Sequence, residues 1–434
     1  MGLNNQATKP ISRLVFPITD FQRKRKRMMD QQFSIPDVNK RLSILMVAPQ
    51  PFFSPRGTPF SVLHRIKALS LLGHSVDLLT YHIGQNIDIE NLKIYRIGKI
   101  PFVKKIKIGP SKTKLLLDFY LYLLTRKMLK QKQYDLLHTH EEACFWGVPL
   151  AKKYGLPHLY DMHSSLPQQL KNFKYTQLGF LLRLFNKLEQ HTIHNSRAVI
   201  TICPELQRYV ESGFPDKTSV LIENVADNRL VFKSSRDIAA ELRQRYNIPF
   251  RHLVLYYGTL EPYQGIDLLL QSLSVMQKKG RDDVHFLLVG GSREQVNNYR
   301  QKAKSLNIDH KITFTGFMAP ESIPSVVDMA DLLVSPRLSG TNSPLKIYSY
   351  LRSEKPIVAT NHITHTQIFD ETVAVLSDIE PISFARAIEW VLDHPEKANQ
   401  LAQRAKTLAR ERYGYEDYLQ KLNWIVEQSV MGKN

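Results

Sequence analysis

Short apolar runs recur along the chain, and each is followed by a loop and by a segment with helical spacing. The first run covers residues 42–48 and is continuous rather than alternating, which is typical of a parallel strand buried on both faces. Thr58 is expected to cap the next helix, with Pro59 in its first turn. Gly73 would end that helix, and residues 75–81 would form the next strand. This strand, helix and strand make the first unit of a doubly wound sheet.

The same alternation continues to about residue 225 and then restarts. The first series predicts strands at 134–138, 158–163 and 198–202, and helices at 143–154 and 178–195. The second predicts strands at 252–257, 284–289, 311–314, 332–335 and 356–359, and helices at 265–277, 344–352, 382–393, 395–411 and 415–428. Two such series, joined by an irregular region at about 225–250, indicate an α/β protein with two Rossmann-like domains facing a central cleft.

Length and composition agree with two globular domains. The chain has 434 residues, more than one hydrophobic core usually holds, with 43% hydrophobic and 23% charged residues. The apolar run 115–124 contains Asp118 and is too short to span a membrane. The N-terminus lacks the apolar region of a signal peptide. The two cysteines, Cys144 and Cys203, are far apart. We therefore expect a cytoplasmic protein with reduced thiols.

The formal net charge of +19 predicts anionic partners. One basic cluster, residues 23–27, lies in a segment without periodicity and is interpreted as a solvated tail, with nuclear targeting or nucleic-acid contact as the lesser alternative. No RNA- or DNA-binding module is visible, so nucleic acid is not an expected partner. Residues 99–132 place lysines around the apolar run 115–124. This pattern is typical of a peripheral element on an anionic membrane surface, but equally of a helix that packs its leucines on its own domain.

Loops after the strands are the candidate ligand sites, because ligands bind at the carboxyl ends of strands in open α/β sheets. Gly57 lies in the first such loop and allows either a close backbone approach or a simple tight turn. Ser343 is a plausible N-cap, with Pro344 as the first helical residue. Lys346 follows within the first turn, where a cation is unfavourable unless it meets an anion. A phosphate, with Arg337 as a second cation, explains this placement; a lysine that reaches solvent is the alternative.

An ordered set of motifs resembles the family 4 glycosyltransferases. The motifs are residues 45–57, 135–140 and 162–163 in the first series, and 256–270, 287–291, 312–316, 330–336 and 355–360 in the second. The resemblance covers residues 42 to about 428. It implies the GT-B architecture, in which the last helix crosses back to the first domain. The expected parts are a basic flexible tail (1–40), an acceptor domain (41–225), a donor domain (226–412) and the crossover helix (413–434).

The resemblance also implies a reaction. A sugar would pass from a nucleotide-diphosphate sugar, UDP- or GDP-linked, to a glycan, lipid-linked or small-molecule acceptor with retention of configuration and without a metal or other cofactor. His163 matches the family's histidine beside the transferred sugar and is the expected catalytic residue; a purely structural histidine at the strand end is the alternative. Asn224 matches the family's interdomain turn. The cytoplasmic face of a membrane is a plausible place for a lipid-linked acceptor.

Four positions depart from the family pattern. Thr341 and Ser349 stand where two glutamates are usual, and Thr259 and Gln264 stand where an arginine and a lysine usually hold the diphosphate. We therefore expect Arg337 and Lys346 to bind the phosphates instead. The predicted donor-binding residues are Gly57, Thr58, Gly258, Thr259, Gln264, Gly316, Arg337, Thr341, Asn342, Ser343, Pro344, Leu345, Lys346 and Ser349.

Other chemistry is less favoured by the sequence. Glu141 and Glu142 would bind acceptor hydroxyls or form a solvated acidic turn. Neither His138-x-His140 nor His362-x-x-His365 has a third ligand nearby in sequence, and we expect His138 and His140 to point to opposite faces of their strand, so no metal site is predicted. An inactive protein that binds a nucleotide sugar or glycan is the alternative function. A nicotinamide-dependent oxidoreductase is disfavoured because no G-x-G-x-x-G follows the first strand.

Overall fold

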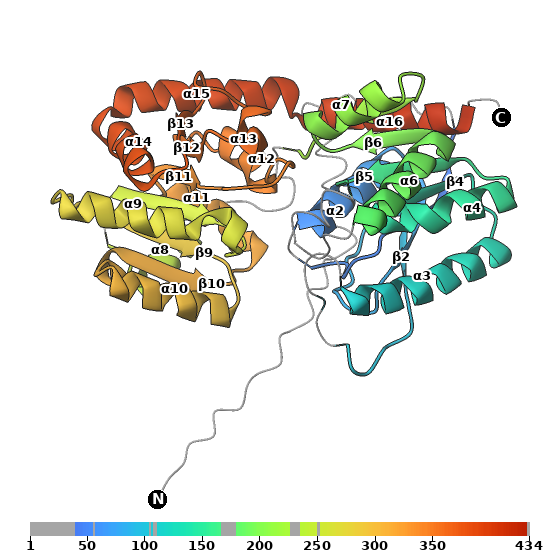
Figure 1. The fold of residues 1–434 in the computed structure, drawn as a ribbon, viewed down its shortest axis with the longest axis horizontal. Coiled ribbons are helices and arrows are strands. Elements are labelled where there is room, and N and C mark those ends of the chain that lie inside the picture. The colour runs from blue at the N-terminus through green and yellow to red at the C-terminus, as the bar shows by residue number, and fades with distance from the viewer. Residues whose placement is uncertain are drawn as a thin grey trace, which may run out of the picture.

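The computed structural model describes residues 40–54, 57–103, 106, 111–165, 179–225, 235–249 and 252–431. Two α/β domains lie side by side, with the N-terminal half of the chain in one and the C-terminal half in the other (Figure 1). Residues 1–39 of the expected tail, including the basic cluster at 23–27, lie outside the described residues. None of the helices in these ranges is long and apolar enough to cross a membrane.

The first domain is built on a seven-stranded parallel sheet. Its strand order is β3-β2-β1-β4-β5-β6-β7. The strands are β1 (Ser43–Val47), β2 (Ser75–Thr80), β3 (Leu92–Arg96), β4 (Leu136–His140), β5 (His158–Met162), β6 (Ala198–Thr201) and β7 (Ser219–Leu221). Its helices are α2 (Gly57–Leu71), α3 (Lys112–Gln131), α4 (Cys144–Tyr154), α6 (Gly179–Asn195) and α7 (Pro204–Gly213).

The second domain repeats this design with a six-stranded parallel sheet. Its strand order is β10-β9-β8-β11-β12-β13. The strands are β8 (His252–Tyr257), β9 (Val284–Val289), β10 (Ile312–Gly316), β11 (Leu332–Ser335), β12 (Ile357–Thr360) and β13 (Val375–Ser377). The helices are α8 (Arg236–Arg245), α9 (Ile266–Lys278), α10 (Arg293–Ser305), α11 (Ile323–Met329), α12 (Leu345–Arg352), α13 (Ile363–Thr366), α14 (Pro381–Asp393) and α15 (Pro395–Arg412).

The continuous apolar runs are explained by cores on both faces of each sheet. In β1, Ile44 and Met46 belong to one core cluster, whereas Leu45 and Val47 belong to another. Successive side chains of a strand point to opposite faces, so a strand covered by helices on both sides needs apolar residues at every position. The central strand β8 of the second domain divides its side chains between two clusters in the same way.

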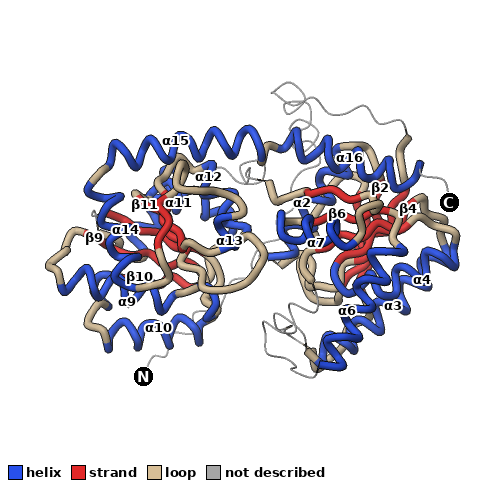
Figure 2. The backbone as a smooth tube through the Cα atoms, turned by 45° about the horizontal axis from the view of Figure 1, so that its top comes forward, coloured by secondary structure: helices blue, strands red, loops and turns tan. Residues whose placement is uncertain are grey.

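The last helix, α16 (Tyr415–Met431), returns to the first domain. α15 runs across the top of the second domain, and the chain then continues into α16 beside β6 and α2 (Figure 2). Tyr415, Leu419, Leu422 and Ile425 are buried in the same cluster as Ile44 of β1. The predicted fold class, two Rossmann-like domains with a crossover helix, is confirmed.

Several boundaries differ from the sequence predictions. Helix α2 already begins at Gly57, and the Thr58 hydroxyl donates to Glu141 rather than capping the helix. At α12 the N-cap is Pro344 instead of Ser343, whose hydroxyl accepts a hydrogen bond from Gln367. The region expected to be irregular contains α8, a mostly polar helix. The unpredicted strands β3, β7 and β13 are all edge strands, where one side lacks a partner and the apolar signal is weakest.

Candidate active site

Three glycine-bearing strand ends meet at the edge of the second sheet. Gly258, Gly290 and Gly316 follow or end β8, β9 and β10, and all have φ between +70° and +148°. The Gly290 amide donates to the Gly316 carbonyl at 2.8 Å. A Cβ on Gly290 would lie 2.0 Å from the Gly258 carbonyl oxygen. Only glycine lets these backbones approach so closely. The three loops therefore lie together at the carboxyl ends of β8, β9 and β10.

The loop after β8 is fastened to the loop after β11. A Cβ on Gly265 would lie 1.8 Å from the Pro336 carbonyl oxygen, and the Leu338 amide donates to the Tyr263 carbonyl at 2.9 Å. Gln264 is buried, and its amide group lies 3.5 Å from the Thr259 hydroxyl. The structure therefore brings the predicted residues of these two loops together.

Lys346 is buried and has no anionic partner among the described residues. It lies in the first turn of α12, and its Nζ forms no hydrogen bond within the described chain. The ammonium sits 3.7 Å from the centre of the Tyr256 ring, a cation–π contact. Burial, and next the positive charge of Arg337, hold the pKa of Lys346 well below its usual value. A buried ammonium in this state is strongly stabilised by any anion that reaches it.

Arg337 lies beside this lysine on the loop after β11. Its Nε donates to the Ser339 carbonyl at 2.9 Å, and its guanidinium stacks over the Tyr263 ring at 5.2 Å. Burial lowers its pKa as well. Two buried basic side chains next to a helix N-terminus, one of which lowers the pKa of the other, make a region of positive potential.

The loop before α12 touches the first domain. The Asn342 side-chain amide donates to the His163 carbonyl at 2.7 Å, a hydrogen bond between the two domains. Gln367 holds this loop by donating to the Thr341 carbonyl at 2.8 Å and to Ser343 at 2.9 Å. Leu345 and Ser349 are half-buried on α12. The predicted donor residues from Thr341 to Ser349 therefore lie along one loop and the helix that follows it, and Asn342 of this loop contacts His163.

Glu141 and Glu142 occupy the turn after β4 and are not fully solvated, since each side chain is 16% exposed. Lys114 of α3 forms ion pairs with both, and Thr58 of α2 donates to Glu141 at 3.0 Å. Glu141 has a φ of 47°, an unusual conformation for a residue other than glycine. Thr58, with Gly57 before it in the chain, therefore lies beside the acidic turn of the first domain.

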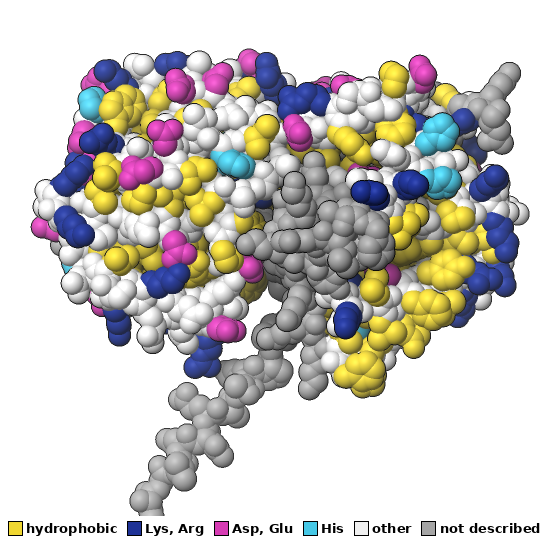
Figure 3. All heavy atoms as spheres, in the orientation of Figure 1, with side chains coloured by type: hydrophobic (Ala, Val, Ile, Leu, Met, Phe, Trp, Pro, Cys, Tyr) yellow, Lys and Arg dark blue, Asp and Glu magenta, His cyan; other side chains and the backbone are white. Residues whose placement is uncertain are grey.

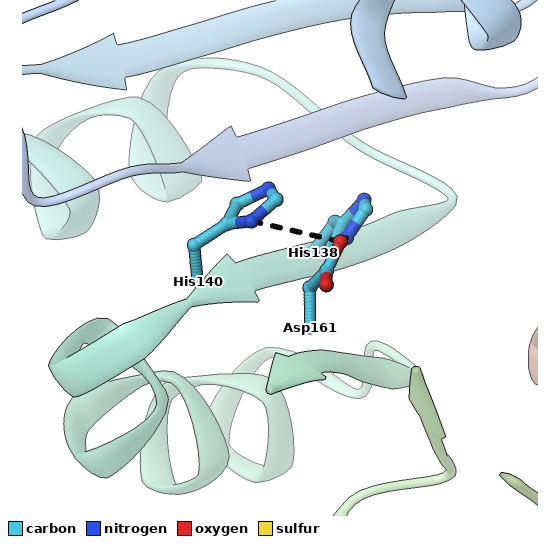
Figure 4. A group of neighbouring side chains, drawn as sticks. All are labelled: His138, His140 and Asp161. Atoms are coloured by element: carbon cyan, nitrogen blue, oxygen red, sulfur yellow. Dashed lines mark ion pairs between the residues drawn. The ribbon is translucent and has the colours of Figure 1, made fainter. Parts of the chain in front are cut away.

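His163 belongs to a buried polar cluster that the sequence analysis missed. Its Nε2 lies 2.9 Å from His140 Nδ1 and 3.4 Å from Asp161 Oδ1. His138 Nε2 lies 3.4 Å from Asp161 Oδ2, and the His138 and His140 rings stack with centroids 4.7 Å apart. Both histidines project from β4 toward Asp161 of β5 (Figure 4). Arg65 of α2 completes the cluster by donating to Asp161 at 2.8 Å.

The expectation that His138 and His140 point to opposite faces is wrong. Residues two apart on a strand share a face, and the same rule pairs Asp161 with His163. The third potential metal ligand, Asp161, comes from the neighbouring strand, so it is close in space although it is distant in sequence. The period-2 rule could have found this cluster, but the neighbour relation of β4 and β5 comes only from the sheet order.

Two family models match the chain. The model described as Glycosyltransferase Family 4 matches residues 55–230, and the model described as Glycosyl transferases group 1 matches residues 239–408. Together they span most of both domains. The chain belongs to the family 4 glycosyltransferases. It is thus a glycosyltransferase, and the enzyme class expected from the sequence is confirmed.

Individual relatives of this glycosyltransferase are distant. The chain is similar to an α-D-kanosaminyltransferase from Streptomyces kanamyceticus, with 23% identity over 302 residues, 67% of this chain and 76% of the relative. Its fold is similar to a sucrose-phosphate synthase from Thermosynechococcus elongatus (TM-score 0.73, 18% identity, 89% and 99% of the two chains). It is also similar to HepE from Anabaena in complex with UDP-glucose (TM-score 0.67, 16% identity, 89% and 100%). These structures support the GT-B fold.

Sequence reasoning missed three further residues of this glycosyltransferase, two of them away from the matched motifs and one directly after a motif. Lys114 pairs with the acidic turn from α3, and Arg65 reaches Asp161 from the middle of α2. Phe317 directly follows Gly316 and is 65% exposed, an unusual state for a phenylalanine at a strand end. No sequence signal marks Lys114 and Arg65, because the residues with which they pair belong to other elements.

Proposed function

We propose that this glycosyltransferase transfers a sugar from a UDP- or GDP-linked donor to a sugar, glycan or lipid-linked acceptor, with retention of configuration and without a metal ion. The observation that carries the proposal is the buried, unpaired Lys346 beside Arg337 at the strand ends of the second domain. A diphosphate would supply the anion that no described residue offers to these two side chains. The HepE structure with UDP-glucose supports a donor of this class.

The chemistry follows from charge development on the leaving group. Breaking the bond between the sugar and the diphosphate leaves negative charge on the phosphate oxygens, and fixed cations stabilise that charge without reorganisation. Lys346, Arg337 and the amides at the start of α12 supply this stabilisation in place of a divalent metal. Backbone amides near Gly258 and Gly316 would hold the remaining phosphate and ribose oxygens, and the exposed Phe317 ring would stack on the base.

The first domain supplies the other side of the site. His163 would hydrogen-bond the transferred sugar. Asn342 binds the backbone of His163 to the loop between β11 and α12 (residues 336–344), here called the donor loop. The carboxylates of Glu141 and Glu142 would accept hydrogen bonds from acceptor hydroxyls, with Lys114 offsetting their charge. His163 follows β5, and the two glutamates follow the adjacent strand β4. Donor and acceptor would therefore meet at one edge of the first sheet.

Thermal unfolding in the presence of candidate donors tests this function. We expect a UDP- or GDP-sugar to raise the melting temperature in EDTA, since a ligand at about one hundred times its Kd stabilises the folded state by roughly 2.7 kcal/mol. ADP- and dTDP-sugars serve as controls for base selectivity. Release of the nucleoside diphosphate, measured with the donor that binds, then reports turnover. Binding without turnover favours the inactive alternative, and no shift with any donor contradicts both.

We further propose that α3 rests on an anionic membrane surface. Its outer face carries exposed apolar side chains, and Figure 3 shows hydrophobic side chains gathered over this part of the first domain, with Lys and Arg at the margin. The exposed residues are Leu115, Leu116, Phe119, Tyr120 and Leu123, with Phe102 nearby in sequence. The helix also bears Lys112, Arg126, Lys127 and Lys130. Its opposite face packs Leu117 and Leu121 in the domain core, so the inward-packing alternative holds for that face only.

Vesicle co-sedimentation tests the membrane proposal. The protein is expected to sediment with vesicles that contain 30% phosphatidylglycerol. Each basic residue near the surface should contribute roughly 1 kcal/mol to the binding free energy, and salt should release the protein. Phe119→Glu combined with Leu115→Glu should lower binding at least about tenfold, since apolar burial is lost and two negative charges face the anionic surface. Ile382→Glu is the matched control, because Ile382 is exposed on α14 of the other domain. Equal sedimentation of all three proteins contradicts the proposal.

A further inference from the structure

A continuous path of buried side chains links the crossover helix to His163. The Tyr418 ring of α16 lies 5.2 Å below the Arg65 guanidinium, and Arg65 binds Asp161 through two nitrogens at 2.8 and 3.4 Å. Asp161 in turn contacts His163 Nε2 at 3.4 Å. Arg65 and Asp161 are 2% and 0% exposed, so this ion pair is removed from water.

The charges in this cluster argue against a metal ion. Although His138, His140 and Asp161 have ligand atoms within 4.8 Å of one another, Asp161 already neutralises Arg65. A divalent ion bound there would bury two further positive charges next to a guanidinium that could not lose its proton. Burial lowers the pKa of each of the three histidines, so their rings are neutral beside the ion pair. The cluster is therefore electrically balanced without a metal.

We propose that Asp161, held in place by Arg65, is a positioning residue for His163. This inference rests on the proposed function, in which His163 contacts the transferred sugar. The carboxylate and His140 both engage the Nε2 edge of the His163 ring. This fixes the orientation of the ring and its tautomer, and turns the Nδ1 edge away from the cluster.

The same arrangement couples the ring to both domains. Asn342 of the donor loop holds the backbone carbonyl of His163, while Asp161 holds its side chain. Tyr418 contacts Arg65 from α16, the helix with which the chain returns to the first domain after completing the second. His163 is thus fixed relative to the donor loop from one side and relative to the first sheet from the other. A ring displaced by as little as 1 Å loses about 10²-fold in rate.

The test compares two variants with the native protein. Asp161→Asn leaves Arg65 buried and uncompensated, and can fail to fold for that reason alone. The double variant Arg65→Gln with Asp161→Asn keeps a neutral hydrogen-bonding pair, so it preserves folding while it removes the carboxylate. In the folded double variant we expect kcat to fall about 10- to 100-fold, with the KM for the donor sugar changed less than about threefold.

Nitrogen NMR of the imidazoles separates positioning from catalysis. With ¹⁵N-histidine labelling, His163→Gln assigns the His163 signals. Native His163 should show one fixed tautomer, and the double variant should show a mixture. Because this readout does not need turnover, it tests the inference even if the proposed reaction is wrong. An unchanged tautomer in the folded double variant overturns it, as does one equivalent of metal that co-purifies with the native protein and is lost from the variant.

Discussion

Replacing Lys346 by methionine is expected to lower the affinity for the nucleotide sugar by about 10- to 100-fold, since a hydrogen bond to a charged group contributes roughly 1.5–3 kcal/mol. The substitution should not lower the free energy of unfolding. The ammonium is buried, forms no hydrogen bond within the described ranges and meets the like charge of Arg337. Methionine has a similar length and keeps the contact with the Tyr256 ring. Its apolar side chain removes the desolvation cost of the lysine.

Two measurements on the same variant distinguish a ligand site from a structural lysine. Calorimetric titration with the donor should show the loss of affinity, and urea unfolding without ligand should show a free energy of unfolding equal to or above that of the native protein. Lys278→Met, an exposed lysine on α9, is the matched control and should change neither. Native affinity in Lys346→Met would remove the main support for the phosphate site.

Mild acid is expected to destabilise the protein strongly. Burial lowers the pKa of His64, His158 and His365 to about 3, and that of His74 to about 4. The unfolded chain takes up these protons near pH 6.5, whereas the folded protein does not, so the free energy of unfolding falls as the pH drops below 6.5. Each histidine contributes up to about 1.4 kcal/mol per pH unit, or roughly 5 kcal/mol for the four at pH 5.5.

Urea unfolding at pH 7.5, 6.5 and 5.5 measures this dependence. His365→Gln should reduce the loss between pH 7.5 and 5.5 by about 1 kcal/mol, because the variant has one fewer group to protonate. Gln at this position can still bond to Ser335 and Thr360, the present partners of the ring. The exposed His252→Gln should leave the loss unchanged. A free energy of unfolding that is equal at pH 7.5 and 5.5 would show that the buried histidines are protonated in the folded state.

The predicted donor residues divide into two groups in the structure. Those between Gly258 and Ser349 come together because their loops follow adjacent strands of one sheet. Gly57 and Thr58 belong instead to the acidic turn of the first domain, where Thr58 bonds to Glu141. Short motifs marked these strand ends as candidate ligand sites, because glycine, proline and N-terminal helix residues signal such positions locally. They did not predict which loops meet, since that depends on sheet order.

The sequence by itself determined the alternation of strands and helices, the two domains and the unusual position of Lys346. Apolar runs and turn residues act over a few neighbouring positions, so they can be recognised without knowing the fold. Only the tertiary structure decided that Asp161 joins Arg65 and three histidines, and that α3 is apolar on both faces. Each of these features needs groups from elements far apart in the chain. Their proximity is fixed by strand order and helix packing, which the local pattern does not encode.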